Sequence, residues 1–188
     1  NYSWIDEHSR VHFVTTYSPY FAEALAITPL ERFEPIDIES NRRLIADGKA
    51  AERLLAYRTS GEFWGKQRAV VVTHNPRTER KKNYTLDSKL ETIRQQLLEM
   101  RQKVNNNERQ WRNREAIIER YHRLCGRLHV SADLFTIGFS VSNSGLQMSF
   151  KKDIYEVNKT RASFGRNIII ADNTDWTTAD IVQASLDR

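Results

Sequence analysis

The stretch LETIRQQLLEMRQKV, residues 90–104, decides the architecture of the middle of the chain. Its apolar side chains recur at spacings of three, four, three and four residues, which is the seam pattern of a coiled coil. One narrow stripe of a helix therefore carries Leu90, Ile93, Leu97, Met100 and Val104. We expect Asp87 or Ser88 to cap the start of this helix, because a short polar side chain can accept a hydrogen bond from a free backbone N–H there.

A second helix is predicted after three consecutive asparagines at residues 105–107. Its apolar residues are spaced four, three and four apart, and they are Ile117, Tyr121, Leu124 and Leu128. This helix should close near residues 126–129, where a glycine and a histidine stand. Two helices with matching stripes predict an antiparallel helical hairpin over about residues 86–128.

Stretches of strand length, rich in β-branched and aromatic residues, lie on both sides of this hairpin. The predicted strands cover residues 11–16, 54–59, 67–74, 134–141, 146–150 and 166–171. The apolar runs within 67–74 and 166–171 suit buried central strands, and Asn-Ser-Gly at 143–145 reads as a hairpin turn. Short helices are predicted at 3–8 and 153–162. Thr177 and Asp180 form a capping-box pattern for a last helix that we expect to run on through Arg188.

Composition narrows the classes of protein. The chain has 188 residues, of which 39% are hydrophobic and 28% charged, as in one globular domain or one domain with an insertion. Its longest apolar run, residues 69–72, is far too short to cross a membrane, so no membrane partner is expected. The single cysteine, Cys125, excludes an internal disulfide framework. Because the chain begins at Asn1 rather than Met, we expect it to be a segment of a longer protein.

Positive charge is concentrated in the middle of the sequence. Residues 77–128 carry 14 basic and 7 acidic side chains, a net charge of +7, whereas residues 1–76 and 129–188 each carry a net charge of −1. A basic block between near-neutral flanks suggests a surface that faces a polyanion such as nucleic acid. A solvated helix that carries Arg and Lys for helix propensity is an equally good explanation of charge alone.

Three patterns could carry chemistry. His122, Cys125 and His129 could share a helical face as zinc ligands, but no fourth ligand is nearby, and surface positions for the histidines are favoured. Gly61 to Lys66 lacks the Gly-Lys-Ser/Thr ending of a phosphate loop and reads as a hairpin turn. Asp172 and Asp175 follow a buried strand, where carboxylates can hold Mg2+, although a polar loop before a helix is the more frequent use of these residues. No serine, histidine and aspartate set and no glycine-rich nucleotide motif is present.

The end of the chain resembles bacterial insertion-sequence transposases of the DDE type, in the superfamily named after insertion sequence four. The residues that carry the likeness are FGRNIIIADN at 164–173 and TADIV at 178–182, followed by Arg188. In that family a Gly-led strand precedes a helix that opens Ser-Ala-Glu-Glu-Ile-Val and continues with Tyr, Arg, Trp and the catalytic Glu. Arg188 takes the Arg position, Ser185 stands where the family usually has Tyr, and the Glu falls four residues beyond Arg188.

The resemblance implies an α/β (α+β) fold, in which a ribonuclease-H-like core carries an inserted mixed β-sheet domain with the long helical hairpin. Residues 1–17 would end the core, 18–173 would form the insertion domain, and 174–188 would start the helix that leads to the catalytic Glu. It also implies Mg2+-dependent nicking and strand transfer of DNA. No catalytic residue or metal ligand is expected within the chain, because both catalytic Asp would lie upstream and the Glu downstream.

The resemblance implies that the partner is DNA, which includes the transposon ends and the target. It places the protein in the bacterial cytoplasm at the nucleoid, and it allows a homodimer in a synaptic complex. Phosphate contacts without base readout are expected from basic residues around the hairpin and at the end of the chain. These residues are Arg77, Arg80, Lys81, Lys82, Arg109, Arg112, Arg114 and Arg188. Two alternatives remain open: a non-enzymatic coiled-coil or DNA-binding module, whose apolar stripe would pair with another chain, and a metal nuclease that uses Asp172 and Asp175.

Overall fold

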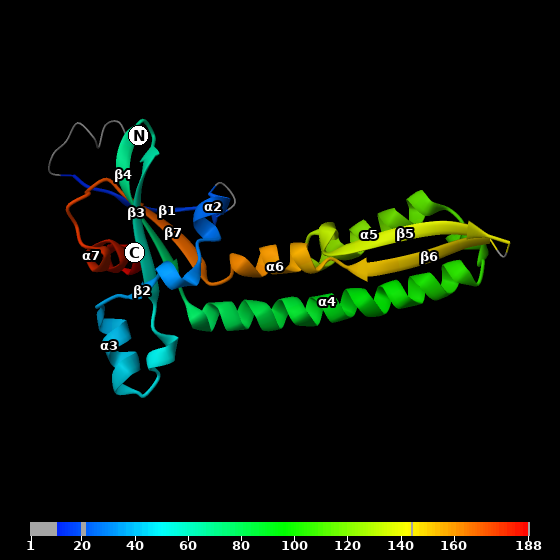
Figure 1. The fold of residues 1–188 in the computed structure, drawn as a ribbon, viewed down its shortest axis with the longest axis horizontal. Coiled ribbons are helices and arrows are strands. Elements are labelled where there is room, and N and C mark those ends of the chain that lie inside the picture. The colour runs from blue at the N-terminus through cyan, green and yellow to red at the C-terminus, as the bar shows by residue number, and fades with distance from the viewer. Residues whose placement is uncertain (1–10, 20–21, 144, 188) are drawn as a thin grey trace. The chain divides into compact units, whose positions relative to one another are not determined.

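A computed structural model describes residues 11–19, 22–143 and 145–187 (Figure 1). The predicted helix at 3–8 and Arg188 lie outside the described residues. The chain forms two compact units. Unit 1 contains residues 1–82 and 162–188, and unit 2 contains residues 83–161.

Unit 1 is built on one five-stranded sheet, in the order β1-β7-β4-β3-β2. The strands are β1 (Val14–Tyr17), β2 (Glu34–Pro35), β3 (Leu55–Phe63), β4 (Lys66–His74) and β7 (Arg166–Ala171). Every strand pair described in this sheet is antiparallel, so the prediction of a mixed sheet is wrong. The physical reason is that a tight turn at Trp64 and Gly65 joins β3 to β4, which permits only antiparallel pairing, and β7 returns antiparallel to β4.

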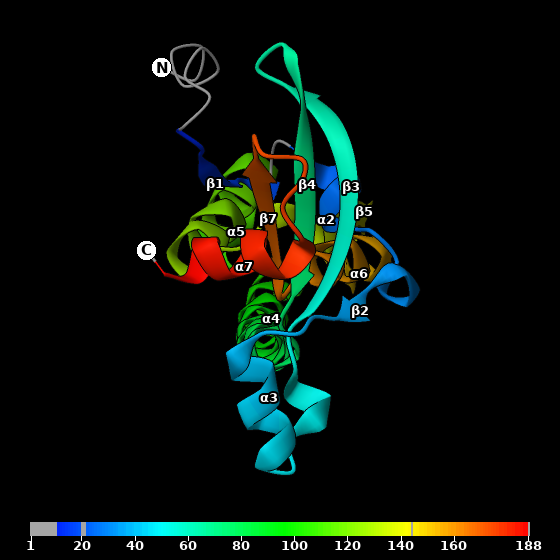
Figure 2. The same ribbon diagram turned by 90° about the vertical axis from the view of Figure 1, so that its left-hand side faces the viewer.

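The two central strands are buried on both faces, which confirms the prediction made from their apolar runs. On one face Val70, Val72 and Ile168 form a core with helix α2 (Glu23–Ala26). On the other face Val71 and Ile169 pack with α7 (Thr178–Leu186) and the start of α3 (Glu39–Ala46). Figure 2 shows α7 lying across the sheet. Alternate residues of a strand point to opposite faces, so a continuous apolar run supplies two cores at once.

Helix α4 (Pro76–Asn105) begins ten residues earlier than predicted. Its cap is Asn75, whose Oδ1 accepts a hydrogen bond from the backbone N–H of Thr78 at 3.1 Å, and Pro76 takes the first helical position. The prediction of a cap at Asp87 or Ser88 is therefore wrong. An Asn-Pro pair that ends a strand is here also the start signal of the next helix.

Unit 2 contains the predicted helical hairpin and the predicted β-hairpin. Helix α5 (Arg114–Leu128) returns antiparallel to α4, and strands β5 (Phe135–Ser142) and β6 (Gly145–Lys152) pair with each other (Figure 1). Helix α6 (Ile154–Ala162) follows, with Asp153 as its cap. The short 3-10 helices of the chain are η2 (Leu30–Arg32), η3 (Ala50–Glu52), η4 (Arg109–Trp111) and η5 (Ala132–Leu134).

Both long helices of unit 2 pack on the β5–β6 ribbon. From α4, Asn105 Oδ1 accepts a hydrogen bond from the N–H of Met148 at 2.9 Å, and Arg101 lies 5.4 Å from the ring centre of Phe150. From α5, Ile118 and His122 line one shallow groove with β5. The apolar stripe of α4 is buried, with Leu97 at 0% exposure. The chain itself therefore covers the stripe.

The C-terminal helix ends earlier than predicted. Thr177 and Asp180 form the predicted capping box, but α7 ends at Leu186 with Asp187 as its C-cap instead of running through Arg188. The compact units divide after residues 82 and 161. Strand β1 pairs along β7, so residues predicted to belong to separate domains share one sheet.

Candidate nucleic-acid interface

The net positive charge of the chain belongs to unit 2. Unit 2 carries 14 basic and 9 acidic side chains, a net charge of +5, whereas unit 1 carries 15 of each. Within unit 2, residues 101–127 carry 8 basic and 3 acidic side chains. These residues form the end of α4, the α4–α5 turn and most of α5. A local excess of this kind raises the concentration of a polyanion near the surface.

The α4–α5 turn is closed by one of the predicted DNA contacts. Arg112 donates hydrogen bonds from Nε and Nη2 to the backbone oxygen of Asn107, at 3.1 and 2.9 Å. Asn107 has a φ of 56°, which is the left-handed conformation that Asn tolerates. The Arg112 guanidinium is therefore engaged with the backbone that leaves α4, and its first role is to hold the turn.

The two neighbouring arginines are more available. Arg109 and Arg114 are both exposed. Arg114 lies 6.0 Å from the ring centre of Phe139, a distance at which the guanidinium still reaches solvent. Arg109, in η4, makes no hydrogen bond or ion pair with the residues that the structure describes. These two side chains can donate to phosphate oxygens without breaking a hydrogen bond or ion pair to another described residue.

Two further cationic side chains lie near the ring of a half-buried tryptophan at this turn. Trp111 has the Arg120 guanidinium 4.2 Å from its ring centre and the Lys103 ammonium 5.2 Å away. Sequence reasoning did not select Lys103 or Arg120, because the three residues come from α4, η4 and α5 and no local spacing joins them. We call Lys103, Arg109, Trp111, Arg114 and Arg120 the turn cluster. It is a basic and aromatic surface of the type that nucleic acid favours.

The second predicted group lies at the start of α4. Arg77, Arg80, Lys81 and Lys82 are all exposed and occupy consecutive turns of the helix within unit 1. Arg80 Nη2 lies 2.6 Å from Glu52 Oε1, and the Lys82 ammonium lies 5.8 Å from the ring centre of Phe164. Part of this charge is therefore neutralised or engaged inside the unit. Arg188 lies outside the described residues.

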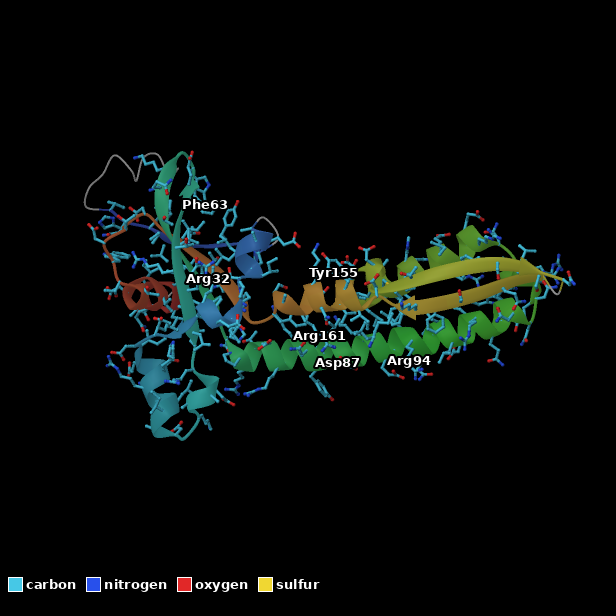
Figure 3. All side chains as sticks on the ribbon, viewed as in Figure 1. Arg32, Phe63, Asp87, Arg94, Tyr155 and Arg161 are labelled. Atoms are coloured by element: carbon cyan, nitrogen blue, oxygen red, sulfur yellow. The ribbon has the colours of Figure 1, made fainter. Side chains whose placement is uncertain are left out.

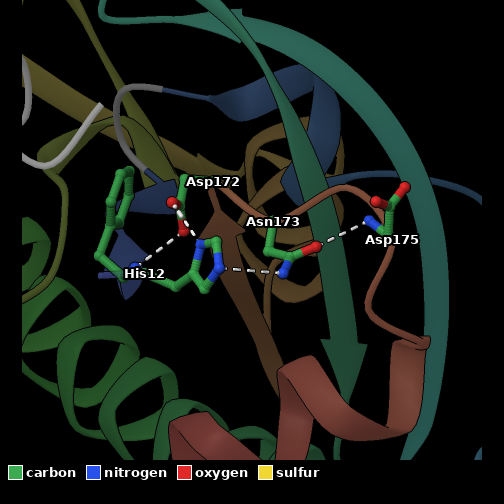
Figure 4. Close-up of polar contacts among 5 residues, drawn as sticks. His12, Asp172, Asn173 and Asp175 are labelled. Atoms are coloured by element: carbon green, nitrogen blue, oxygen red, sulfur yellow. Dashed lines mark hydrogen bonds and ion pairs between the residues drawn. The ribbon is translucent and has the colours of Figure 1, made fainter. Parts of the chain in front are cut away.

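Asp172 and Asp175 do not form a metal site in the described structure (Figure 4). Asp172 accepts a hydrogen bond from the N–H of Phe13 at 2.8 Å on one oxygen, and its other oxygen lies 3.0 Å from His12 Nδ1. The N–H of Asp175 donates to Asn173 Oδ1 at 2.9 Å, which is an Asx turn. Both Asp172 oxygens thus tie β1 to the end of β7. These contacts favour the polar-loop interpretation.

The histidine and cysteine pattern on α5 is also not assembled as a site. Cys125 is buried at 2% exposure, and burial raises the pKa of its thiol, whereas His122 and His129 are exposed. His129 caps the helix with a φ of 51°. Among the described residues, no three His, Cys, Asp or Glu side chains are grouped so that they could hold a metal ion.

Comparisons with protein-family models, with curated proteins and with solved structures find no match for this chain. Within the described part of the chain, no helix combines the length and the apolar character needed to cross a lipid bilayer.

Proposed function

We propose that this chain is part of a DDE transposase and that unit 2 contacts DNA during transposition. The observation that carries the DNA contact is the concentration of unit 2's net charge of +5 around the α4–α5 turn. The exposed Arg109 and Arg114 beside the Trp111 cations give this surface donors for phosphate oxygens.

The end of the chain supports the family assignment. Residues 166–171 form strand β7, and the helix that follows opens with the capping box of Thr177 and Asp180. This is the strand and helix order that the transposase signature requires. Strand β1, assigned to the end of the ribonuclease-H-like core, pairs with β7, the strand that directly precedes the segment assigned to the core helix.

When bound, Mg2+ would activate the nucleophile and stabilise the leaving oxygen in such an enzyme. The resemblance assigns the ligands of this ion to residues outside the present chain. The role proposed for this chain is therefore to bind and orient DNA. Its cationic side chains would hold the backbone phosphates, and α7 would lead the chain toward the catalytic Glu.

The coiled-coil alternative receives less support. It requires the apolar stripe of α4 to be free for another chain, but Ile93, Leu97 and Val104 are all at 0% exposure within this chain. An apolar surface that is already buried gives no further free energy on association.

The coding sequence downstream of Arg188 tests the family assignment. A Trp-x-x-Glu, with the Glu four residues beyond Arg188 and followed by Phe-Arg and Lys, supports the transposase. A downstream sequence without this Glu contradicts it. For the full-length protein we expect Mg2+-dependent nicking of a duplex that carries the element's terminal sequence, and none when the metal is chelated.

A further inference from the structure

The β5–β6 ribbon has an uncovered face that no part of the sequence argument used. Apolar side chains alternate along both strands and face the helices, among them Phe139, Met148 and Phe150. The opposite face carries the cross-strand pairs Thr136↔Lys151, Gly138↔Ser149 and Ser140↔Gln147. Thr136, Ser140, Ser149 and Lys151 are exposed. The ribbon therefore presents hydroxyl groups and an ammonium group to solvent.

The charge of the ribbon has one sign. Neither β5 nor β6 contains an Asp or Glu, and β6 ends with Lys151 and Lys152. The nearest carboxylate in sequence, Asp153, accepts a hydrogen bond from the N–H of Glu156 at 3.1 Å on Oδ1, because it caps α6. Two ammonium groups therefore stand beside one carboxylate that is engaged as a helix cap, and the rest of the polar face is uncharged.

The ribbon face is also hollowed where α6 begins. A shallow depression of about 580 Å³ is lined by residues of both strands and of the start of α6: Thr136, Gly138, Ser149, Phe150, Lys151, Lys152, Asp153, Ile154 and Tyr155. Tyr155 is 72% exposed and projects from the first turn of α6 (Figure 3). Gly138 lies in the floor, and a Cβ there would come within 2.9 Å of Ser149 Oγ, so the absence of a side chain keeps the surface low.

We infer that this ribbon face binds the sugar–phosphate backbone of DNA, as a contact separate from the turn cluster. Lys151 supplies charge on this face, and Lys152, which pairs with Phe135 at the end of the ribbon, lines the same depression and adds a second ammonium group. The hydroxyls of Thr136 and Ser149 supply short donors to phosphate oxygens. Tyr155 adds an exposed ring and hydroxyl at the rim of the depression, where they can contact the deoxyribose of the DNA backbone. The inference rests on the proposed function, because it takes DNA as the partner of unit 2.

The first test is DNA binding by the whole chain as a function of salt. Fluorescence anisotropy would compare the wild type with Lys151→Gln/Lys152→Gln and with a control, Lys49→Gln/Lys66→Gln, which makes the same change of charge in unit 1. Each lost phosphate contact reduces the slope of log K against log salt by about 0.9. We expect the ribbon variant to have a slope shallower by about 2, and the control to match the wild type.

A position-specific test uses a photo-crosslinker. Cys125, the cysteine of the wild-type chain, is buried, so a thiol-reactive aryl azide should label an introduced exposed cysteine selectively. The cysteine is introduced at an exposed position of the ribbon by Ser149→Cys and, in the control protein, at an exposed position of unit 1 by Ser40→Cys. We expect crosslinks to duplex DNA from the Ser149→Cys protein and not from the Ser40→Cys protein. Absence of DNA binding by the wild type at low salt would contradict the proposed function itself. The ribbon inference alone would be overturned by a different result: the wild type binds DNA, the ribbon variant keeps the wild-type salt slope, and the Ser149→Cys protein gives no crosslink.

Discussion

Gly165 shows how one residue fixes the start of a helix in unit 1. Its φ is +73°, and a Cβ at this position would lie 2.6 Å from the backbone oxygen of Asn75, the residue that caps α4. The N–H of Asn75 in turn donates to the Gly165 oxygen at 2.9 Å. The glycine that precedes β7 is thus required by a positive φ and by a close backbone approach.

Replacing Gly165 should destabilise the protein. We expect Gly165→Ala to lower the free energy of unfolding by about 2 kcal/mol or more, because the αL conformation and the overlap with Asn75 both oppose a Cβ. Gly126→Ala is the matched control, since Gly126 lies within α5 with open space around its Cα, and alanine favours a helix by about 1 kcal/mol. Urea unfolding measures both, and similar midpoints for the two variants would contradict the structure.

His74 should make the stability of the protein depend on pH. It is 2% exposed, and its Nε2 lies 3.3 Å from Glu79 Oε2. Among the residues that the structure describes, its Nδ1 has no hydrogen-bond partner. Burial, and next Arg166, lower the pKa of His74, while Glu79 opposes them. The folded state therefore favours the neutral ring, and the unfolded chain binds the proton more readily at about pH 6.5 and below.

We expect the free energy of unfolding to be insensitive to this group above about pH 7 and to fall as the pH drops below about 6.5. His74→Gln should reduce that fall, whereas His122→Gln, at an exposed position, should retain it. Urea titrations from pH 7.5 to 5 measure the effect. An identical pH profile for wild type and His74→Gln would show that the buried histidine does not control it.

At the scale of elements, the apolar stripe of α4 is an internal core. We expect Leu97→Ala to cost about 3 kcal/mol of unfolding free energy, because Leu97 is fully buried and truncation leaves a cavity. Leu98→Ala, one position off the stripe and only partly buried, is the matched control and should cost clearly less. If the stripe were instead a seam between two chains, the unfolding midpoint of the wild type would rise with protein concentration.

The sequence predicts helices and strands correctly where a single local pattern of apolar residues determines them. The apolar runs of β4 and β7, the ribbon and the stripes of the helical hairpin all follow from local periodicity. The start of α4 was missed because Asn75-Pro76 is both a strand stop and a helix cap, and only tertiary contacts such as those of Gly165 decide between them.

At the scale of the whole molecule, the sequence predicts the sign and place of the charge but not the cluster that uses it. Arg120 and Lys103 reach Trp111 from separate helices, so no spacing in the sequence marks them. Arg112, selected by its charge, instead donates to the Asn107 carbonyl. Strands β1 and β7 pair although their partners are 151 to 157 positions apart, so no local pattern in the sequence predicts this pairing.

We propose that the charge of unit 2 binds DNA at the α4–α5 turn. The most direct test is the salt dependence of duplex binding by the whole chain, for the wild type and for Arg109→Gln/Arg114→Gln. A second variant changes Arg77, Arg80, Lys81 and Lys82 to Ala at the start of α4. Arg112 is left in place because it holds the turn.

We predict that wild-type affinity falls steeply with salt and that the Arg109→Gln/Arg114→Gln variant has a slope shallower by about 2. The variant with four substitutions at the start of α4 should have a slope that corresponds to the loss of fewer than about 4 phosphate contacts. The reason is that Arg80 and Lys82 are partly engaged within unit 1. A wild-type protein that does not bind duplex DNA at low salt, or an unchanged slope in the Arg109→Gln/Arg114→Gln variant, would contradict the claim.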